Sequence, residues 1–124
     1  MIHLDTNYLI GLLLPDSPQA AQFDSWILAG EIVGTSAMAW GEFLCGPLSD
    51  KDSSIALAVL ATIESVTTAD AELAAELFNK SGRRRGSLAD CIIAAVALRS
   101  GASIATENRA DFIPFMSAGL TIVP

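Results

Sequence analysis

Four acidic residues of this chain lie in segments that otherwise look like protein core: Asp5, Glu42, Asp90 and Asp111. The first three are each the only charged residue in a long run, and these runs cover residues 1–15, 32–49 and 86–98, respectively. A carboxylate that is buried without a partner costs several kcal/mol or takes up a proton. The fold must therefore bring these acids to a common partner, and a divalent cation held by all four would be such a partner.

The composition fits a single folded domain over residues 1–124. A chain of 124 residues, of which 52% are hydrophobic, is long enough to form one core without disulfides. Its 7 basic and 14 acidic residues give a net charge of −7, which argues against nonspecific binding to nucleic acid or to anionic membranes. Without the four lone acids the charge is only −3, so the global charge is weak evidence on this point.

The two cysteines, Cys45 and Cys91, each lie in an apolar helical pattern. We expect both to be reduced thiols in the core, as in a cytoplasmic protein. Asp5 interrupts the apolar start that a signal peptide would need, and no apolar run reaches the length of a membrane span. The sequence therefore predicts a cytoplasmic protein with no membrane partner.

Apolar periodicity and the positions of proline and glycine predict strands that alternate with helices. The expected strands cover residues 2–4, 32–35, 102–106 and 120–123, with a short β-like link at 65–68. The expected helices cover residues 6–14, 17–30, 36–46, 55–63, 71–78 and 87–100, with a polar loop at 79–86 and a helical turn at 111–116. This order predicts an α/β fold with a central, mostly parallel sheet and helices on both faces.

The acids are placed to meet at one edge of this sheet. Asp5 ends the first strand, Thr106 ends a late strand, and Asp111 follows shortly after it. Glu42 and Asp90 lie on helices that can lean over the same edge, beyond the carboxyl ends of the strands, where such sheets bind ligands. A site of carboxylates without histidine or cysteine favours Mg²⁺ or Mn²⁺ over zinc, and these ions promote phosphodiester hydrolysis.

Neutral polar residues are expected at the same edge. Thr6, Asn7, Thr106 and Asn108 follow the ends of the first and the late strand. Their side chains can orient the carboxylates or a bound water through hydrogen bonds.

Each acid also has a purely structural interpretation. Asp5 can cap the helix that follows it, and Ser87 with Asp90 fits a capping box. Asp111 can cap a turn, and Glu42 can face solvent. These interpretations stay open beside metal binding, and for Asp90 both roles can hold at once.

Residues 79–86 contain four of the seven basic residues. The segment is either a solvated loop or a phosphate clamp in which Arg83, Arg84 and Arg85 bind the substrate through their bidentate guanidinium groups. His3, the single histidine, is expected to have a structural role.

Four segments resemble, in order, the motifs of PIN-domain proteins. They are Met1–Asn7 (MIHLDTN), Ser36–Gly46 (SAMAWGEFLCG), Leu88–Ala95 (LADCIIAA) and Ile104–Phe112 (IATENRADF). The resemblance extends over the whole chain, and the small single-domain form is similar to the VapC-type toxins of bacterial and archaeal toxin–antitoxin pairs. It implies the PIN-like three-layer α/β/α fold and the activity of a Mg²⁺- or Mn²⁺-dependent endoribonuclease.

The resemblance also implies roles for individual residues. Asp5, Glu42 and Asp90 correspond to the catalytic acids that bind the metal. Asp111 is taken as the fourth acid, with Asn108 supporting it, although some relatives carry the acid at the position of Asn108. The choice between these two positions, and between one and two metal ions, stays open.

The implied partners are an RNA substrate, a second copy in a homodimer, and a cognate antitoxin that inserts into the acidic cleft. Glu107 departs from the family pattern, in which a basic residue usually follows the threonine, and this change can weaken contact with RNA or alter the partner interface. The alternative function is a non-catalytic PIN-like module that acts by binding protein. An aspartyl-phosphate phosphatase is disfavoured, because it needs an acid where this chain has Asn7.

Overall fold

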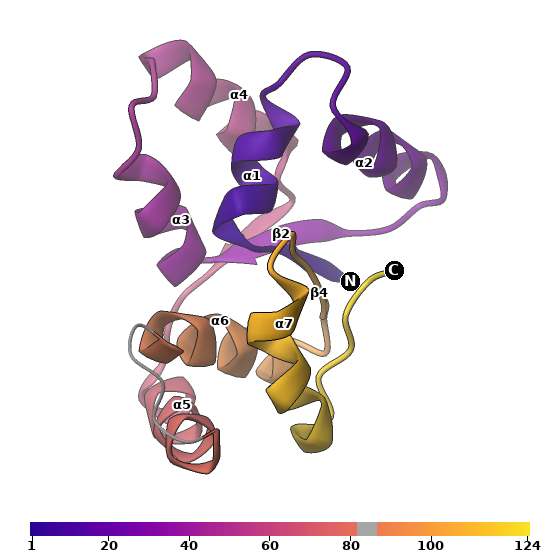
Figure 1. Cartoon of the computed structure of the whole chain (residues 1–124). Helices are drawn as coiled ribbons and strands as arrows, with labels where there is room; N and C mark the ends of the chain where they lie inside the picture. The colour runs from indigo at the N-terminus through magenta and orange to yellow at the C-terminus, as the bar shows by residue number, and fades with distance from the viewer. Residues whose placement is uncertain (82–86) are drawn as a thin grey trace.

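Helices and short strands alternate along the chain (Figure 1). The computed structural model describes residues 1–81 and 87–124, apart from the side chain of Ser87. The strands are β1 (Ile2–Leu4), β2 (Val33–Ser36), β3 (Thr62–Glu64) and β4 (Ser103–Ala105). The helices are α1 (Thr6–Leu12), α2 (Pro18–Leu28), α3 (Ala37–Leu44), α4 (Asp50–Val59), α5 (Thr68–Lys80), α6 (Ser87–Arg99), α7 (Arg109–Phe112) and the 3₁₀ helix η1 (Ile113–Ala118).

The strands form a parallel sheet in the order β3-β2-β1-β4. On β1, His3 is level with Gly34 of β2 and with Ile104 of β4. A Cβ atom at Gly34 would lie 2.7 Å from Cγ2 of Thr62 and 2.8 Å from its carbonyl oxygen, so the pairing of β2 with β3 requires glycine there. Because the strands are parallel, their carboxyl ends share one edge. The predicted α/β class is confirmed.

Helices cover both faces of the sheet (Figure 1). Helices α1 to α4 lie on one face, and α5, α6 and α7 lie on the other. Ile2 and Leu4 of β1 pack with Leu9 and Phe43 in the first core. Ile104 of β4 packs with much of α6 in the second core. Since neighbouring side chains of a strand point to opposite faces, Ile104 and Ala105 of β4 enter different cores, as a three-layer fold requires.

The prediction of a helix over residues 55–63 is wrong at both ends. The helix α4 begins earlier, because Ser49 and Asp52 form a capping box. It also ends earlier, and the rest of the apolar run forms β3, which pairs with β2. A short apolar run does not by itself distinguish helix from strand. The β-like link predicted at 65–68 is also wrong, since the strand precedes it and α5 already begins at Thr68.

The boundaries of two later segments also differ from the prediction. The loop expected to begin at residue 79 begins later, because α5 continues to Lys80. The strand expected at 120–123 is reduced to a single bridge between Ile104 and Ile122. The N–H of Ile104 donates to the carbonyl of Thr121 at 2.9 Å, and the N–H of Val123 donates to Ile104 at 2.8 Å. The C-terminal tail, residues 120–124, therefore lies beside β4 without extending the sheet by a full strand.

The cysteine prediction is half right. Cys91 is buried in α6, whereas Cys45 is exposed, so the expectation of a core thiol is wrong there. Cys45 stands at the C-cap of α3, just past Phe43, the last buried residue of that helix. In residues 1–81 and 87–124, no helix combines the length and the apolar character that crossing a membrane requires.

An ion pair between the buried Asp70 and the exposed Arg99 joins the start of α5 to the end of α6. Asp70 is 2% exposed, and its Oδ1 accepts a hydrogen bond from Nε of Arg99 at 2.8 Å. Its Oδ2 accepts from the backbone N–H of Thr67 at 2.8 Å. Burial alone would raise the pKa of Asp70, but the hydrogen bonds from Arg99 and Thr67 outweigh burial and hold that pKa below its ordinary value. Nη2 of Arg99 also donates to the carbonyl of Ser65 at 2.9 Å.

Replacing Asp70 with alanine should lower the free energy of unfolding by about 2–3 kcal/mol, because the change removes hydrogen bonds to a charged, buried group. Asp52→Ala is the matched control. Asp52 closes the capping box of α4 with Ser49, as Asp70 does for α5 with Thr67, but the described residues give it no ion pair. Urea denaturation at neutral pH should show a clearly smaller loss for the control. Equal losses would contradict the role of the ion pair.

The same comparison has a pH dependence of known sign. The pKa of Asp70 is lower in the folded protein than in the unfolded chain, so its contribution is fully present above the unfolded pKa, about 4. That contribution is lost as the pH falls through the lower, folded pKa. The difference between wild type and Asp70→Ala should therefore shrink steadily below about pH 4.

Candidate active site

Asp5 is the buried acid at the carboxyl end of β1. It is 4% exposed, and its backbone N–H donates to the carbonyl of Ala105 at 2.9 Å, which continues the pairing of β1 with β4. Oδ1 accepts from the backbone N–H of Thr6 at 2.7 Å, so the carboxylate caps α1. Oδ2 accepts from the hydroxyl of Thr106 at 2.8 Å. The capping role proposed for Asp5 thus exists, and it leaves one oxygen facing the end of β4.

Thr106 connects the ends of the neighbouring strands β1 and β4 at this edge. It is buried directly after β4, and its hydroxyl donates to Asp5 while its oxygen accepts the backbone N–H of Asn108 at 2.9 Å. The first bond holds the Asp5 carboxylate in place. The second holds the loop that leads into α7, on which Asp111 lies.

Glu42 reaches the same edge from α3. Ser36 caps this helix through a hydrogen bond to the N–H of Ala39, which places Glu42 in the second turn, directly before the buried Phe43. The Glu42 side chain is exposed, and Oε1 accepts from the hydroxyl of Thr6 at 2.9 Å. Glu42 is therefore held beside the residue whose N–H binds Asp5.

Asp90 is the half-buried acid on the first turn of α6. Burial, and after it the negative charges of Asp5, Asp111 and Glu42, together raise the pKa of Asp90 to about 6. Burial likewise raises the pKa of Asp5, against the hydrogen bonds from Thr106 and Thr6 that lower it, and Glu42 and Asp111 add to the rise. The four acids thus act on one another electrostatically, although they come from four separate segments.

The donor set suits a hard divalent cation with water in its shell. Within residues 1–81 and 87–124, no three His, Cys, Asp or Glu side chains converge closely enough to hold an ion by themselves. Mg²⁺, however, is typically bound by only one or two carboxylates and keeps several waters. Burial, and to a smaller extent the charges of the neighbouring acids, raise the pKa values of Asp5 and Asp90, and a bound cation would favour their charged forms. The residues present therefore fit Mg²⁺ or Mn²⁺.

The other predicted site residues that the structure describes have fewer side-chain contacts than Asp5 and Glu42. Asp111 lies on the first turn of α7 and is exposed, and it takes part in the site through its charge. Asn108 precedes α7 without a side-chain capping bond, and its backbone N–H donates a hydrogen bond to the hydroxyl oxygen of Thr106. Asn7 is exposed on α1. Arg83, Arg84 and Arg85 lie outside the described residues, as does the side chain of Ser87, so the phosphate clamp and the capping box with Asp90 stay predictions.

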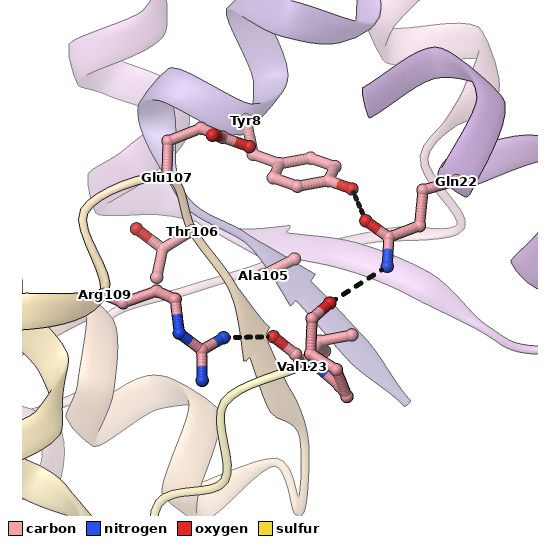
Figure 2. A pocket seen from close by; sticks show the side chains of 8 residues that line it. Tyr8, Gln22, Ala105, Thr106, Glu107, Arg109 and Val123 are labelled. Atoms are coloured by element: carbon pink, nitrogen blue, oxygen red, sulfur yellow. Dashed lines mark hydrogen bonds between the residues drawn. The ribbon is translucent and has the colours of Figure 1, made fainter. Parts of the chain in front are cut away.

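A small pocket opens on the other side of Thr106 (Figure 2). Its volume is about 220 Å³, and it lies between α1, α2, the loop after β4 and the C-terminal tail. Tyr8, Gln22 and Arg109 contribute to it, and the sequence analysis did not single out any of them. No local pattern could have done so, because these residues are brought together only by the packing of α1 and α2 against the tail.

Comparison with known proteins agrees with this geometry. The family model described as PIN domain matches residues 2–113. Similar solved structures include FitAcB from Neisseria gonorrhoeae (24% identity, covering 100% of this chain and 97% of that chain, TM-score 0.74). VapBC2 from Rickettsia felis, bound to a DNA fragment from its promoter, is also similar (18% identity, covering 99% of this chain and 98% of that chain, TM-score 0.74).

A third similar structure is VapC20 from Mycobacterium tuberculosis, a sarcin–ricin loop cleaving toxin (22% identity, covering 99% of this chain and 98% of that chain, TM-score 0.67). A search of curated protein sequences finds no significant match. At these identities the structures establish the fold. The family model, which covers most of the chain, confirms the predicted resemblance. This chain belongs to the PIN domain family.

Proposed function

We propose that this protein is a Mg²⁺- or Mn²⁺-dependent endoribonuclease that acts as the toxin of a toxin–antitoxin pair. One observation carries the proposal: Asp5, buried at the end of β1, and Asp90, on α6, each have a pKa raised by burial and by the other acids of the group. Carboxyls with raised pKa values near one sheet edge are typical of catalytic sites. Membership of the PIN domain family supports the same reading.

Each acid has a chemical task that follows from its position. Asp5 and Asp90 are the most buried of the group, and we assign them to direct contact with the ion. When bound, the ion would polarise the phosphodiester and lower the pKa of a coordinated water. Glu42 is exposed and held through Oε1 by Thr6, and the described residues leave its Oε2 available to accept the proton of the attacking water. Asp111 adds negative charge that helps to retain the ion.

We infer further that the protein acts together with a cognate antitoxin. Similar structures include a toxin–antitoxin complex from Klebsiella pneumoniae and FitAB bound to a DNA fragment. A chain with a net charge of −7 is electrostatically suited to an antitoxin segment rich in arginine or lysine. A homodimer in the cytoplasm is the form we propose for the toxin.

Asp5→Asn and Asp90→Asn should each reduce Mg²⁺-dependent RNA cleavage by about 100-fold or more, because each removes a charge needed to hold the ion. Thr106→Val should reduce it by about 10- to 100-fold, since it removes the hydroxyl that positions Asp5. Asp24→Asn, an exposed change on α2, is the control and should leave cleavage unchanged. Initial rates on a single-stranded RNA measure these effects.

Cleavage that survives both Asp5→Asn and Asp90→Asn would show a contaminating nuclease. Absence of cleavage and of metal binding in the wild type would favour a protein-binding module.

Metal binding should also depend on pH. The pKa of Asp90 is raised to about 6 in the folded protein, so its favourable contribution to metal-free stability is present below the ordinary carboxyl pKa and is lost as the pH rises through 6. The metal-free protein should consequently gain stability from this group on acidification from pH 7.5 to pH 5. Mg²⁺ should raise the Tm more at pH 7.5 than at pH 5, because protons compete with it below pH 6. Thermal denaturation with and without Mg²⁺ measures both trends, and Asp90→Asn should flatten them. An equal Mg²⁺ shift at both pH values would contradict metal binding at Asp90.

A further inference from the structure

The pocket beside Thr106 is not used by the metal chemistry proposed above. Thr106 belongs to both features: its hydroxyl binds Asp5, and the same residue lines the pocket. The pocket is therefore one residue away from Asp5, and Figure 2 shows Thr106 among the residues that line it. Its volume of about 220 Å³ is below the roughly 300 Å³ at which sites for drug-sized ligands begin. It is suited to a part of a nucleotide, such as one base.

The inner wall of the pocket has little hydrogen-bonding capacity left. The hydroxyl of Tyr8 donates to Oε1 of Gln22 at 2.6 Å, and Nε2 of Gln22 donates to the backbone oxygen of Pro124 at 3.2 Å (Figure 2). Burial, and to a smaller extent the charge of Glu107, raises the pKa of Tyr8 to about 12, so this hydroxyl keeps its proton and its bond. Tyr8 also stacks on Trp26, with ring centroids 5.6 Å apart. The inner wall is thus rigid, and selectivity must come from the other side.

The other side carries two opposite charges. Glu107 and Arg109 lie in the loop after β4 and at the start of α7, and both are exposed. Figure 2 shows them on the same side of the pocket, with the Glu107 carboxylate near Tyr8 and the guanidinium of Arg109 directed at Val123. Nη1 of Arg109 donates to the carbonyl of Val123 at 2.6 Å, which fixes the guanidinium. Among the described residues, the Glu107 carboxylate and the Nε and Nη2 groups of Arg109 have no other partner.

The Glu107 carboxylate and the Arg109 guanidinium are complementary to a ligand that has a pair of donors on one edge and a pair of acceptors on another. A carboxylate accepts two hydrogen bonds side by side, and a guanidinium donates two. Guanine has adjacent N1–H and N2–H₂ donors, and its O6 and N7 acceptors match arginine. Adenine, cytosine and uracil each lack the adjacent pair of donors.

We propose that this pocket binds a guanine base of the RNA strand, with Glu107 on the N1–H and N2–H₂ groups and Arg109 on O6 and N7. The inference rests on the proposed ribonuclease function and adds a base preference to it. Glu107 and Arg109 are then specificity-determining residues, placed beside the acids by Thr106. A basic residue in place of Glu107 would not accept the guanine donors.

Binding of free nucleosides to the metal-free protein is the first test, because it does not depend on cleavage. In NMR titrations guanosine should bind about tenfold or more tightly than inosine, which lacks the N2 amino group, and than adenosine. Glu107→Gln should remove the difference between guanosine and inosine. The matched control Glu72→Gln, an exposed acid on α5, should keep it. Arg109→Lys should remove the preference for guanosine over 7-deazaguanosine, which lacks N7. Equal binding of all nucleosides, or none, would overturn the proposal.

The second test separates a base of RNA from a free guanine nucleotide. Oligoribonucleotides that differ only by guanine, inosine or adenine at one position are bound in EDTA, where metal-dependent cleavage cannot occur, and their affinities are measured by fluorescence anisotropy. A guanine preference of about tenfold that Glu107→Gln abolishes supports the proposal, even if the protein cleaves no RNA and the nuclease function fails. A preference among nucleosides without one among oligonucleotides would assign the pocket to a free guanine nucleotide and overturn the proposal.

Discussion

The hydrogen bond from the hydroxyl of Thr106 to the buried carboxylate of Asp5 is the contact on which the rest of the site depends. It joins the ends of β1 and β4 at 2.8 Å and holds an acid in place that is only 4% exposed. The oxygen of Thr106 also binds the N–H of Asn108, so the same residue fixes the loop that carries Glu107 and leads to α7. One side chain therefore links the buried acid to the loop that lines the neighbouring pocket.

The protein contains buried acids of two kinds, and their pKa values separate them. Asp70 is fully paired, because Arg99 and Thr67 satisfy its oxygens, and its pKa is lowered despite burial. The pKa values of Asp5 and Asp90 are raised, first by burial and then by the charges of the other acids. The first kind stabilises the packing of α5 on α6. The second kind opposes folding, which is a cost that proteins typically accept at functional sites.

Local sequence signals predicted the elements that have clear ends. Ser17 and Ser36 cap α2 and α3 as expected, since a side-chain oxygen before an apolar helix satisfies free backbone N–H groups. The errors fall where a local pattern is ambiguous. The apolar run at 55–63 divides between α4 and β3, because only pairing with β2 makes its last part a strand. Cys45 looked like core but lies at the end of α3, where the apolar stripe has already turned to solvent.

The sequence by itself determined the α/β class, the lone acids and the order of the motifs, because each is a property of a short stretch with its own physical cost. Only the tertiary structure decided which side chains meet. Thr106 reaches Asp5 across 101 residues, Thr6 reaches Glu42 across 36, and Gln22 lies beside the C-terminal tail. Such contacts depend on the register of the parallel strands and on the packing of helices against them. A shift of one residue in that register would turn the same side chains to the opposite face of the sheet.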